Sequence, residues 1–291
     1  MRLTDKRVLV TGGGQGLGRA LGLQFAKSGA EVIVTDIDGK RAARVAEEVA
    51  NGGRAPLSYT LDVTSAEQVA DVRECILRER GAIDVLVNNA GVVFGGSFLD
   101  VPIERHRLTI DINLSGILTV THGFLPDLLA KPEGYVVNIV SASAVIALPY
   151  ATSYAASKAA ALSFSDSLRE ELRLAGRRGV RVLPVCPSYI STGLFDGARA
   201  PVMTWILQPD YVALQTVRAV ERGREFLMLP WTARLLYGTC GWMPSSLYRR
   251  LCAWLGVSTS MAQWRGHAPA KETVPSSAAN SPSQKLTHSN S

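Results

Sequence analysis

The sequence predicts an α/β fold with one doubly wound parallel sheet and helices on both of its faces. Short runs rich in Val, Ile and Leu alternate with longer helical stretches along most of the 291 residues. The runs are apolar almost without interruption, which is typical of parallel strands that are covered on both faces. Alternation of strand and helix favours right-handed crossovers, which bring successive strands into one sheet.

Seven runs are predicted as strands because each is short and dominated by β-branched or other apolar residues. In chain order they are RVLVT (7–11), EVIVTD (31–36), PLSYTLDV (56–63), DVLVNN (84–89), YVVNIVS (135–141), VRVLPVC (180–186) and EFLML (225–229). The stretches between them are longer and have helical patterns. They predict helices at residues 16–28, 39–51, 65–80, 103–130, 151–176 and 209–222.

Composition indicates one domain at residues 1–264 and a disordered tail, rich in Ser, Pro and Ala, at 265–291. Hydrophobic residues make up 47% of the chain and charged residues 19%, which indicates a substantial core and excludes a largely disordered protein. The net charge of +6 is scattered, with the pairs Arg177-Arg178 and Arg249-Arg250 but no long basic run. No nucleic-acid partner is therefore predicted.

The four cysteines (Cys75, Cys186, Cys240 and Cys252) show no CxxC pairing and no histidine at metal-ligand spacing. They predict free thiols in a reducing cytoplasm and no metal site, with Cys186 as a buried residue at a strand end. The first apolar run is too short for a signal peptide, and no stretch has the ~18 uninterrupted apolar residues of a membrane span. A cytoplasmic protein is expected, with membrane association left open.

A glycine-rich turn between the first strand and the first helix predicts a phosphate site. It reads Thr11-Gly12-Gly13-Gly14-Gln15-Gly16-Leu17-Gly18, where backbone N–H groups and the positive helix end can hold a pyrophosphate. The spacing Gly12-x3-Gly16-x-Gly18 departs from a strict GxGxxG match. Asp36 ends the second strand, where an acid binds the ribose of NAD and repels the 2′-phosphate of NADP. The neutral Gln15 agrees with NAD, and a plain strand-end cap is the alternative role for Asp36.

The stretch from Ser153 to Lys158 places a phenol and an ammonium four residues apart in an alanine-rich helix. Residues i and i+4 lie on the same helix face, so Tyr154 and Lys158 are expected side by side. An ordinary buried tyrosine beside a lysine that reaches to solvent fits the same pattern.

Five motifs in order resemble the classical short-chain dehydrogenase/reductase family, over about residues 5–230. They are Thr11-Gly12-x3-Gly16-x-Gly18, Asn88-Asn89-Ala90-Gly91, Asn113, Ser141 and Tyr154-x3-Lys158. The resemblance implies a single-domain Rossmann fold with a seven-stranded sheet, assembled into a homodimer or homotetramer. It also implies a nicotinamide cofactor, NAD in preference to NADP.

The resemblance implies catalytic roles for four side chains. Tyr154 would be the general acid/base, Ser141 would orient the substrate oxygen, and Lys158 would bind the nicotinamide ribose. Asn113 would hold a water that links Lys158 to solvent. Ser143 is a less favoured substitute for Ser141. A phenol near pKa 10 is a poor base at neutral pH. The ammonium of Lys158 and the positive charge of the oxidised nicotinamide are therefore expected to lower the pKa of Tyr154 by about two to three units.

The resemblance also implies a set of cofactor-binding residues. Besides Tyr154 and Lys158 they are Thr11, Gly12, Gln15, Gly16, Leu17, Gly18, Asp36, Asp62, Val63, Asn89, Ala90, Gly91, Pro187, Ile190 and Thr192. The family's Pro-Gly pair after the sixth strand appears as Pro187-Ser188. Because serine lacks the conformational freedom of glycine, the loop on the nicotinamide side is expected to differ from the family's geometry.

Substrate specificity is expected beyond the sixth strand, at the carboxyl ends of the strands. An apolar lid is predicted there from Phe195, Met203, Trp205, Ile206 and Leu207, with Leu148 and Pro149 opposite. The lid predicts a small hydrophobic alcohol or ketone as substrate, although Arg199 is a candidate cation for an acidic one.

The extension at about 230–264 carries tryptophans, leucines and arginines beyond the usual family core. It predicts a second lid and dimer contact, a helix lying on a membrane, or ordinary packing on the domain's flank. The extension loosely resembles the retinol and 17β-hydroxysteroid dehydrogenase-like branch, which acts on lipophilic alcohols.

The leading functional prediction is an NAD(P)-dependent oxidoreductase, with NAD(H) preferred, for a steroid, retinoid or fatty-alcohol-like substrate. A carbonyl or ketoacyl-type reductase in biosynthesis is the alternative. A catalytically inactive nucleotide-binding scaffold is disfavoured, because such a protein has no need for Asn113, Ser141, Tyr154 and Lys158 together.

Overall fold

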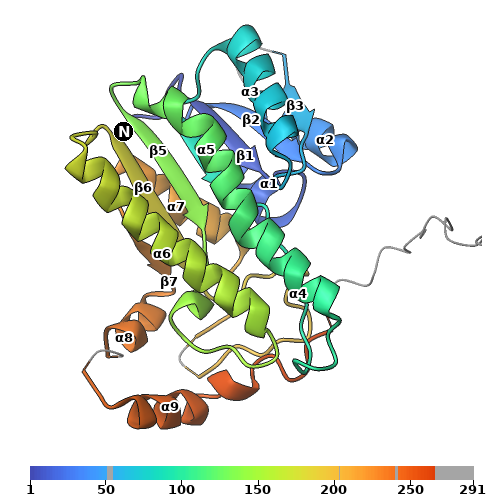
Figure 1. Ribbon diagram of the computed structural model, residues 1–291, viewed down its shortest axis with the longest axis vertical. Coiled ribbons are helices and arrows are strands. Elements are labelled where there is room, and N and C mark those ends of the chain that lie inside the picture. Colours follow the sequence, from blue (N-terminus) through green and yellow to red (C-terminus); the bar gives the residue numbers. More distant parts are fainter. Residues whose placement is uncertain (51–54, 203, 240–241, 266–291) are drawn as a thin grey trace, which may run out of the picture.

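The computed structural model describes residues 1–50, 55–202, 204–239 and 242–265. Within them, seven parallel strands form one sheet in the order β3-β2-β1-β4-β5-β6-β7. Figure 1 shows the helices on either side of this sheet and the pair α8 and α9 at its lower end. Met203, Cys240 and the predicted tail beyond residue 265 lie outside the described residues.

All seven predicted strands are present, with ends that differ by a few residues. They are β1 Arg7–Thr11, β2 Glu31–Asp36, β3 Leu57–Thr60, β4 Val85–Asn88, β5 Gly134–Ile139, β6 Val180–Pro187 and β7 Leu227–Leu229. The helices are α1 Gly16–Lys27, α2 Gly39–Val49, α3 Ala66–Arg80, α4 Ile103–Ile110, α5 Gly116–Leu129, α6 Thr152–Leu174, α7 Pro209–Glu221, α8 Trp231–Thr239 and α9 Ser245–Trp254. The predicted doubly wound fold is therefore confirmed.

Two apolar layers hold the helices against the sheet. Alternate side chains of a strand point to opposite faces, so Val8 and Val10 of β1 pack with α1, α2 and α7. Leu9, between them, packs on the other face, where α3, α5 and α6 lie. Because every central strand is covered on both sides, its sequence is continuously apolar, as predicted.

The predicted helix at 103–130 is interrupted by a π-helical turn, Asp111–Ser115 (η1), which joins α4 to α5. The extra residue per turn directs Asn113 inward, where it is fully buried. Single π turns of this kind are frequent at functional sites. Apolar spacing alone did not reveal it.

The continuous helix Ile103–Leu129 is long and apolar enough to cross a membrane by length and composition. Val120, Phe124 and Leu128 of this helix are nevertheless buried against the sheet. Charged or polar residues such as Asn113 and Asp127 are buried on the same helix. These contacts identify it as a core helix of the domain.

The strand order reverses beside β1, which pairs with β2 on one side and with β4 on the other. The chain leaves β1 and β4 toward opposite faces, which opens a crevice at their carboxyl ends. In Figure 1 this edge of the sheet faces the lower part of the molecule, where α8 and α9 lie. Residues that end the strands are thereby brought toward one another.

Candidate active site

The glycine-rich turn after β1 approaches its neighbours too closely for side chains. Gly12 has a φ of +59°, a conformation that favours glycine. A Cβ at Gly18 would lie 2.1 Å from the carbonyl oxygen of Gly12, well inside van der Waals contact. At Gly12 and Gly18 no side chain covers the backbone of the turn. The N–H groups at the N-terminus of α1 are therefore accessible and can bind phosphate.

Asn89 fixes this turn against the end of β4. Its Nδ2 donates to the carbonyl oxygens of Thr11, at 3.0 Å, and Gly12, at 2.9 Å. Its backbone N–H donates to Oγ1 of Thr11 at 3.0 Å. Asn89 and Thr11 thus hold the two loops that flank the crevice in a fixed relation.

Asp36 is buried at the end of β2 and binds the backbone of the turn. Its Oδ2 accepts from the Gly14 N–H at 2.9 Å, and its Oδ1 accepts from the Asp38 N–H at 3.0 Å. The carboxylate is therefore oriented as well as charged. The cap-like role and the proposed ribose-binding role are compatible in this geometry, because a carboxylate accepts several hydrogen bonds.

Arg41 is a residue of this site that sequence reasoning missed. Its Nε donates to Oδ2 of Asp38 and its Nη1 donates to Oε1 of Gln15, both at 2.7 Å. The neutral Gln15 thus has a cation beside it, although Asp38 neutralises the charge of Arg41. The sequence signal was the Asp38–Arg41 spacing of three residues at the start of a helix.

A cleft of about 280 Å³ runs along the carboxyl ends of the strands, from Asp36 to Lys158. Fifteen of the seventeen predicted cofactor residues line it: Gly12, Gln15, Gly16, Leu17, Asp36, Asp62, Val63, Asn89, Ala90, Gly91, Tyr154, Lys158, Pro187, Ile190 and Thr192. Thr11 and Gly18 lie behind the lining. The residues that the prediction missed include Ile37, Arg41, Ile112 and Phe195.

Tyr154 and Lys158 lie on one face of α6, and both are buried. The Lys158 ammonium lies 5.8 Å from the centre of the Tyr154 ring and donates to the Ile139 carbonyl oxygen at 2.8 Å. A Cβ at Gly91 would lie 3.6 Å from Nζ of Lys158 and 3.1 Å from Oδ1 of Asn113. Gly91 therefore keeps open the space beside the ammonium.

Asn113 anchors the loop after β4. Its Oδ1 accepts from the Val92 N–H at 2.8 Å, and its Nδ2 donates to the Val92 carbonyl at 2.9 Å. The same Nδ2 donates to Oγ of Ser157 at 3.1 Å. Asn113 thus joins the π turn to Val92 and to α6, while its role in holding a water stays a prediction.

Ser141 follows β5 and faces a second cavity. Ser143 donates to Oγ of Ser141 twice, from its backbone N–H at 3.1 Å and from its hydroxyl at 3.0 Å. The hydroxyl of Ser143 therefore supports that of Ser141 in this arrangement.

Burial dominates the ionisation of the site. It raises the pKa of Tyr154 to about 12, and the hydroxyl of Ser141 offsets only part of the rise. It also lowers the pKa of Lys158 to about 8. The pKa of Tyr154 is therefore shifted opposite to the expected direction, because burial destabilises the phenolate more than its neighbours stabilise it. Burial likewise raises the pKa of Cys186 to about 12, consistent with the predicted inert thiol.

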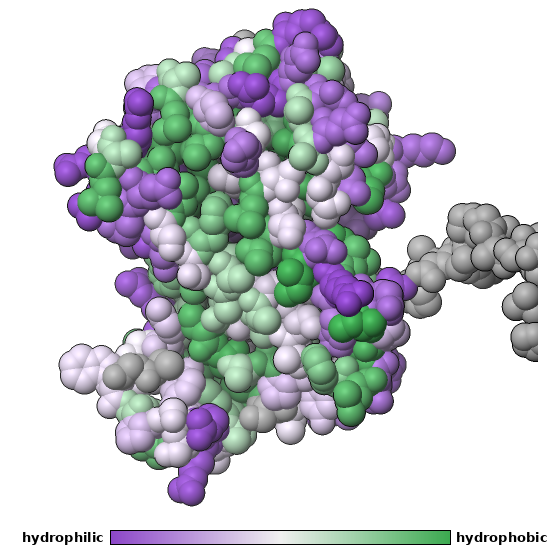
Figure 2. All heavy atoms as spheres, viewed as in Figure 1, coloured by the Kyte–Doolittle hydropathy of each residue, from purple (hydrophilic) through white to green (hydrophobic). Residues whose placement is uncertain are grey.

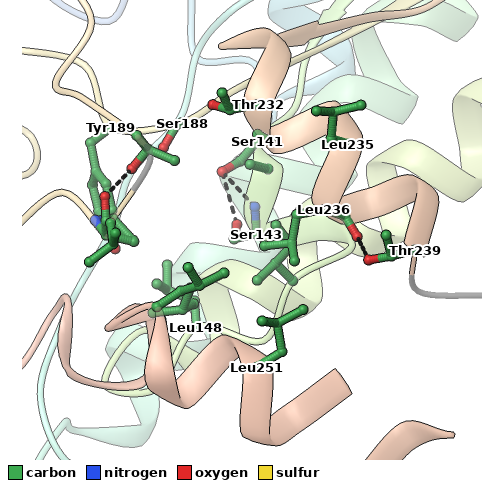
Figure 3. Close-up of a pocket in the computed structure, with 18 of the residues that line it drawn as sticks. Ser141, Ser143, Leu148, Ser188, Tyr189, Thr232, Leu235, Leu236, Thr239 and Leu251 are labelled. Carbon is green, nitrogen blue, oxygen red and sulfur yellow. Dashed lines mark hydrogen bonds between the residues drawn. The ribbon is translucent and has the colours of Figure 1, made fainter. Parts of the chain in front are cut away.

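The second cavity has a volume of about 250 Å³ and a largely apolar lining. Figure 3 shows Ser141 and Ser143 at its centre, with Leu235 and Leu236 of α8 on one side and Leu251 of α9 opposite. The C-terminal extension therefore forms a wall of this cavity. That location agrees with the predicted second lid.

Ser188 and Phe195 line both the cleft and the cavity, so the two adjoin at the end of β6. The Phe195 ring meets the Tyr154 ring edge-on, with centres 5.7 Å apart. Phe195 thus separates the two spaces and covers Tyr154. The departure from Pro-Gly, Ser188, places a side chain at this junction.

The predicted lid is correct for Phe195 and Leu148, which line the cavity. It is wrong for Leu207, which is buried in the core beside α1 and α7 and pairs with Ile190. Pro149, Trp205, Ile206 and the candidate cation Arg199 lie outside the lining.

Residues 255–265 return across the loop that covers the site. The Tyr189 hydroxyl donates to Oγ of Ser260 at 2.7 Å, and Nε1 of Trp264 donates to the Leu194 carbonyl at 3.1 Å. A Cβ at Gly95 would lie 2.7 Å from the Trp264 ring. This segment therefore ties the loops that flank Tyr154 on both sides, a connection that no sequence pattern indicated.

Comparison with known proteins gives a consistent family. A family model described as short chain dehydrogenase matches residues 6–202. Epidermal retinol dehydrogenase 2 of Mus musculus is 34% identical, over 77% of this chain and 73% of its own length. Short-chain dehydrogenase/reductase 3 of Homo sapiens is 33% identical, over 91% of this chain and 88% of its own.

Solved structures extend the similarity to cofactor complexes. A 3-ketoacyl-(acyl-carrier-protein) reductase from Brucella melitensis, complexed with NADH, has a TM-score of 0.70 at 27% identity and covers 78% of this chain and 97% of its own. A short chain dehydrogenase from Burkholderia cenocepacia J2315, in complex with NADP, has a TM-score of 0.74 at 27% identity and covers 86% and 99%.

Proposed function

The chain belongs to the short-chain dehydrogenase family, and on that basis we propose that it transfers hydride between NAD(H) and a hydrophobic alcohol or its carbonyl form. As a family member it is an oxidoreductase that acts on CH–OH groups and binds NAD(P). The observation that carries the substrate class is the apolar cavity, which contains Ser141 and adjoins the cleft at Ser188 and Phe195. The retinol dehydrogenases among the relatives support the same class.

The cleft fits a nicotinamide dinucleotide. The bare backbone at Gly12 and Gly18 leaves room for a pyrophosphate at the start of α1, and Gly91 leaves room beside Lys158. Asp36 would bind the adenosine ribose, and its negative charge favours NAD over NADP. Arg41 is held by Asp38 and Gln15, so its charge attracts a 2′-phosphate only weakly.

Tyr154 is the proposed general acid/base. With its pKa raised to about 12 it holds its proton at neutral pH and can donate that proton to a carbonyl oxygen. Ser141, oriented by Ser143, would hold the same oxygen. When bound, the cofactor supplies or accepts the hydride. Nζ of Lys158 would stabilise the phenolate that remains, since its charge lies within 6 Å of the ring.

The remaining parts of the proposal concern assembly and location. The family resemblance implies a homodimer or homotetramer, which light scattering of the purified chain measures. We also propose a cytoplasmic location, which the free thiols of Cys75 and Cys186 support.

A substrate panel tests the proposed function. Steroids, retinoids and fatty alcohols, with their carbonyl forms, are assayed by the absorbance of NADH, alongside a short alcohol and a 3-ketoacyl thioester. The proposal expects kcat/KM to be at least about tenfold higher for the lipophilic compounds than for the short alcohol. Turnover of the thioester alone would favour the ketoacyl-type reductase. Tight NADH binding without any turnover would favour the inactive scaffold.

A further inference from the structure

We propose that α8, α9, Trp242 and residues 202–206 (excluding 203) form a docking face for an anionic lipid bilayer, through which lipophilic substrate enters the apolar cavity. This proposal rests on the proposed function for its substrate class. The proposed occupant is the bilayer surface. Three features support it: the exposed apolar side chains of the docking face, its positive charge, and its continuity with the cavity.

Exposed aromatic and aliphatic side chains concentrate on this docking face. They are Val202, Trp205, Ile206, Trp231, Leu235, Tyr237, Trp242, Leu247 and Trp254. Trp242 is 92% exposed and Trp254 is 77% exposed. Tryptophan prefers the boundary between headgroups and acyl chains, because its ring is apolar and its N–H is polar. Such a cluster marks an interaction surface rather than ordinary flank packing.

The charged side chains of the docking face are all positive. Between residues 226 and 265 the sequence contains four arginines (Arg234, Arg249, Arg250 and Arg265) and no Lys, Asp or Glu. Arg234, Arg249 and Arg250 are exposed. Arg234 follows Trp231 by three residues on α8 and Arg250 precedes Trp254 by four on α9, so each pair shares a helix face. In Figure 2 the lower part of the molecule carries hydrophobic and strongly hydrophilic residues side by side. Arginine next to an apolar surface suits anionic headgroups above acyl chains.

A second copy of the chain fits the docking face less well. An isologous contact places the same patch on both partners. Arg249 and Arg250 would then face an equally positive surface, and like charges would oppose the association.

The docking face is continuous with the cavity. Val202, Leu235 and Trp254 are exposed and also line the cavity. Figure 3 shows Leu235 at the upper edge of the cavity and Leu251 of α9 below it. A lipophilic molecule could therefore move from the bilayer to Ser141 along apolar side chains without crossing water.

Vesicle flotation of the purified full chain tests the proposal. The vesicles are phosphatidylcholine alone, or phosphatidylcholine with about one fifth phosphatidylserine. The matched variants are Arg249→Gln/Arg250→Gln on α9 and Arg177→Gln/Arg178→Gln after the far end of α6; all four arginines are exposed. Each pair removes the same charge. Binding to the anionic vesicles is expected to fall about thirtyfold in the α9 pair and to stay unchanged in the other.

A second pair separates apolar insertion from charge. Trp242→Ser is expected to weaken vesicle binding about tenfold, whereas Leu174→Ser, which removes a 77% exposed leucine at the C-terminal end of α6, leaves it unchanged. None of these positions lines the cavity or the cleft. Turnover of a water-soluble short ketone therefore serves as the control for a folded, active enzyme.

Three results would overturn the docking proposal. They are no binding of the active wild-type chain to anionic vesicles, equal losses in both arginine pairs, and a dimer that dissociates on Trp242→Ser. Loss of all turnover with intact vesicle binding would instead contradict the proposed function. The two failures are thus distinguishable.

Discussion

The cleft and the apolar cavity share Ser188 and Phe195, yet they are built from different kinds of structure. The cleft is formed by strand ends and the turns that follow them, and much of its surface is backbone. The cavity is lined by residues 141–148 after β5 and is closed by side chains of α8, α9 and residues 188–202, and among the sheet strands α8 contacts β7 most extensively. The register of the sheet therefore determines the shape of the cleft, whereas side-chain packing determines the shape of the cavity.

This contrast explains where chemistry and specificity reside. A strand end has a fixed position, so Asp36 at the end of β2 is held by the Gly14 N–H, and the Ile139 carbonyl at the end of β5 holds Lys158 of α6. The α8–α9 wall has few backbone ties to the sheet and can change its side chains without moving the strand ends. Substitutions in the cleft and in the cavity should therefore have different effects, and the largest is expected near Phe195, where the cleft and the cavity meet.

The largest effect is expected for Tyr154→Phe. Removing the proposed general acid/base should lower kcat by about 10²–10⁴-fold, while the Kd for NADH stays within about twofold. Stopped-flow turnover and fluorescence titration measure the two quantities.

Tyr189→Phe is the matched control, because Tyr189 lines the cavity and its hydroxyl donates to Ser260. It should retain kcat within about fivefold. Equal losses in the two variants would show that Tyr154 acts through packing.

Gly18→Ala and Gly238→Ala compare the two regions with the same added methyl group. At Gly18 the Cβ would lie 2.1 Å from the Gly12 carbonyl oxygen, so the turn must shift and NADH binding should weaken by about 1–3 kcal/mol. At Gly238, in α8, nothing lies within 4 Å of the Cβ. There the substitution should leave the Kd unchanged and raise the melting temperature slightly, because alanine favours a helix. Calorimetry measures the Kd for NADH and the melting temperature of each variant. Similar Kd values in the two variants would contradict the proposal that the turn at Gly18 must lack a side chain to bind the cofactor.

The parts of the molecule that could be predicted from the sequence are those with a local signal. Continuous apolar runs predict strands, and parallel strands end at one edge, so residues after β1, β2 and β4 were expected to meet. The π turn at Asn113 could not be predicted, since its extra residue leaves the apolar spacing almost unchanged. Arg41 was missed because its position depends on the Asp38 cap.

The substrate side was harder to predict for a physical reason. The cavity forms where α8, α9 and residues 255–265 fold back over residues 188–202, and contacts between distant segments leave no periodic pattern. Leu207 was assigned to the lid on its apolar character, yet it belongs to the core. The predicted lowering of the Tyr154 pKa took no account of burial, which raises this pKa and which the hydrogen bond with Ser141 offsets only in part.

The smallest effect is expected for Asp36→Asn, which removes the charge from the adenosine end of the cleft. An amide oxygen can still accept from the Gly14 N–H, so the turn should keep its shape. Without the carboxylate the repulsion of a 2′-phosphate disappears, and the ratio of the Kd for NADPH to that for NADH should fall about tenfold. Fluorescence titration of both cofactors measures the ratio. Arg41→Gln is the matched control and should move it in the opposite direction, because it removes the nearby cation. An unchanged ratio in Asp36→Asn would show that the cleft distinguishes the two cofactors by shape. The negative charge of Asp36 would then have no part in cofactor choice.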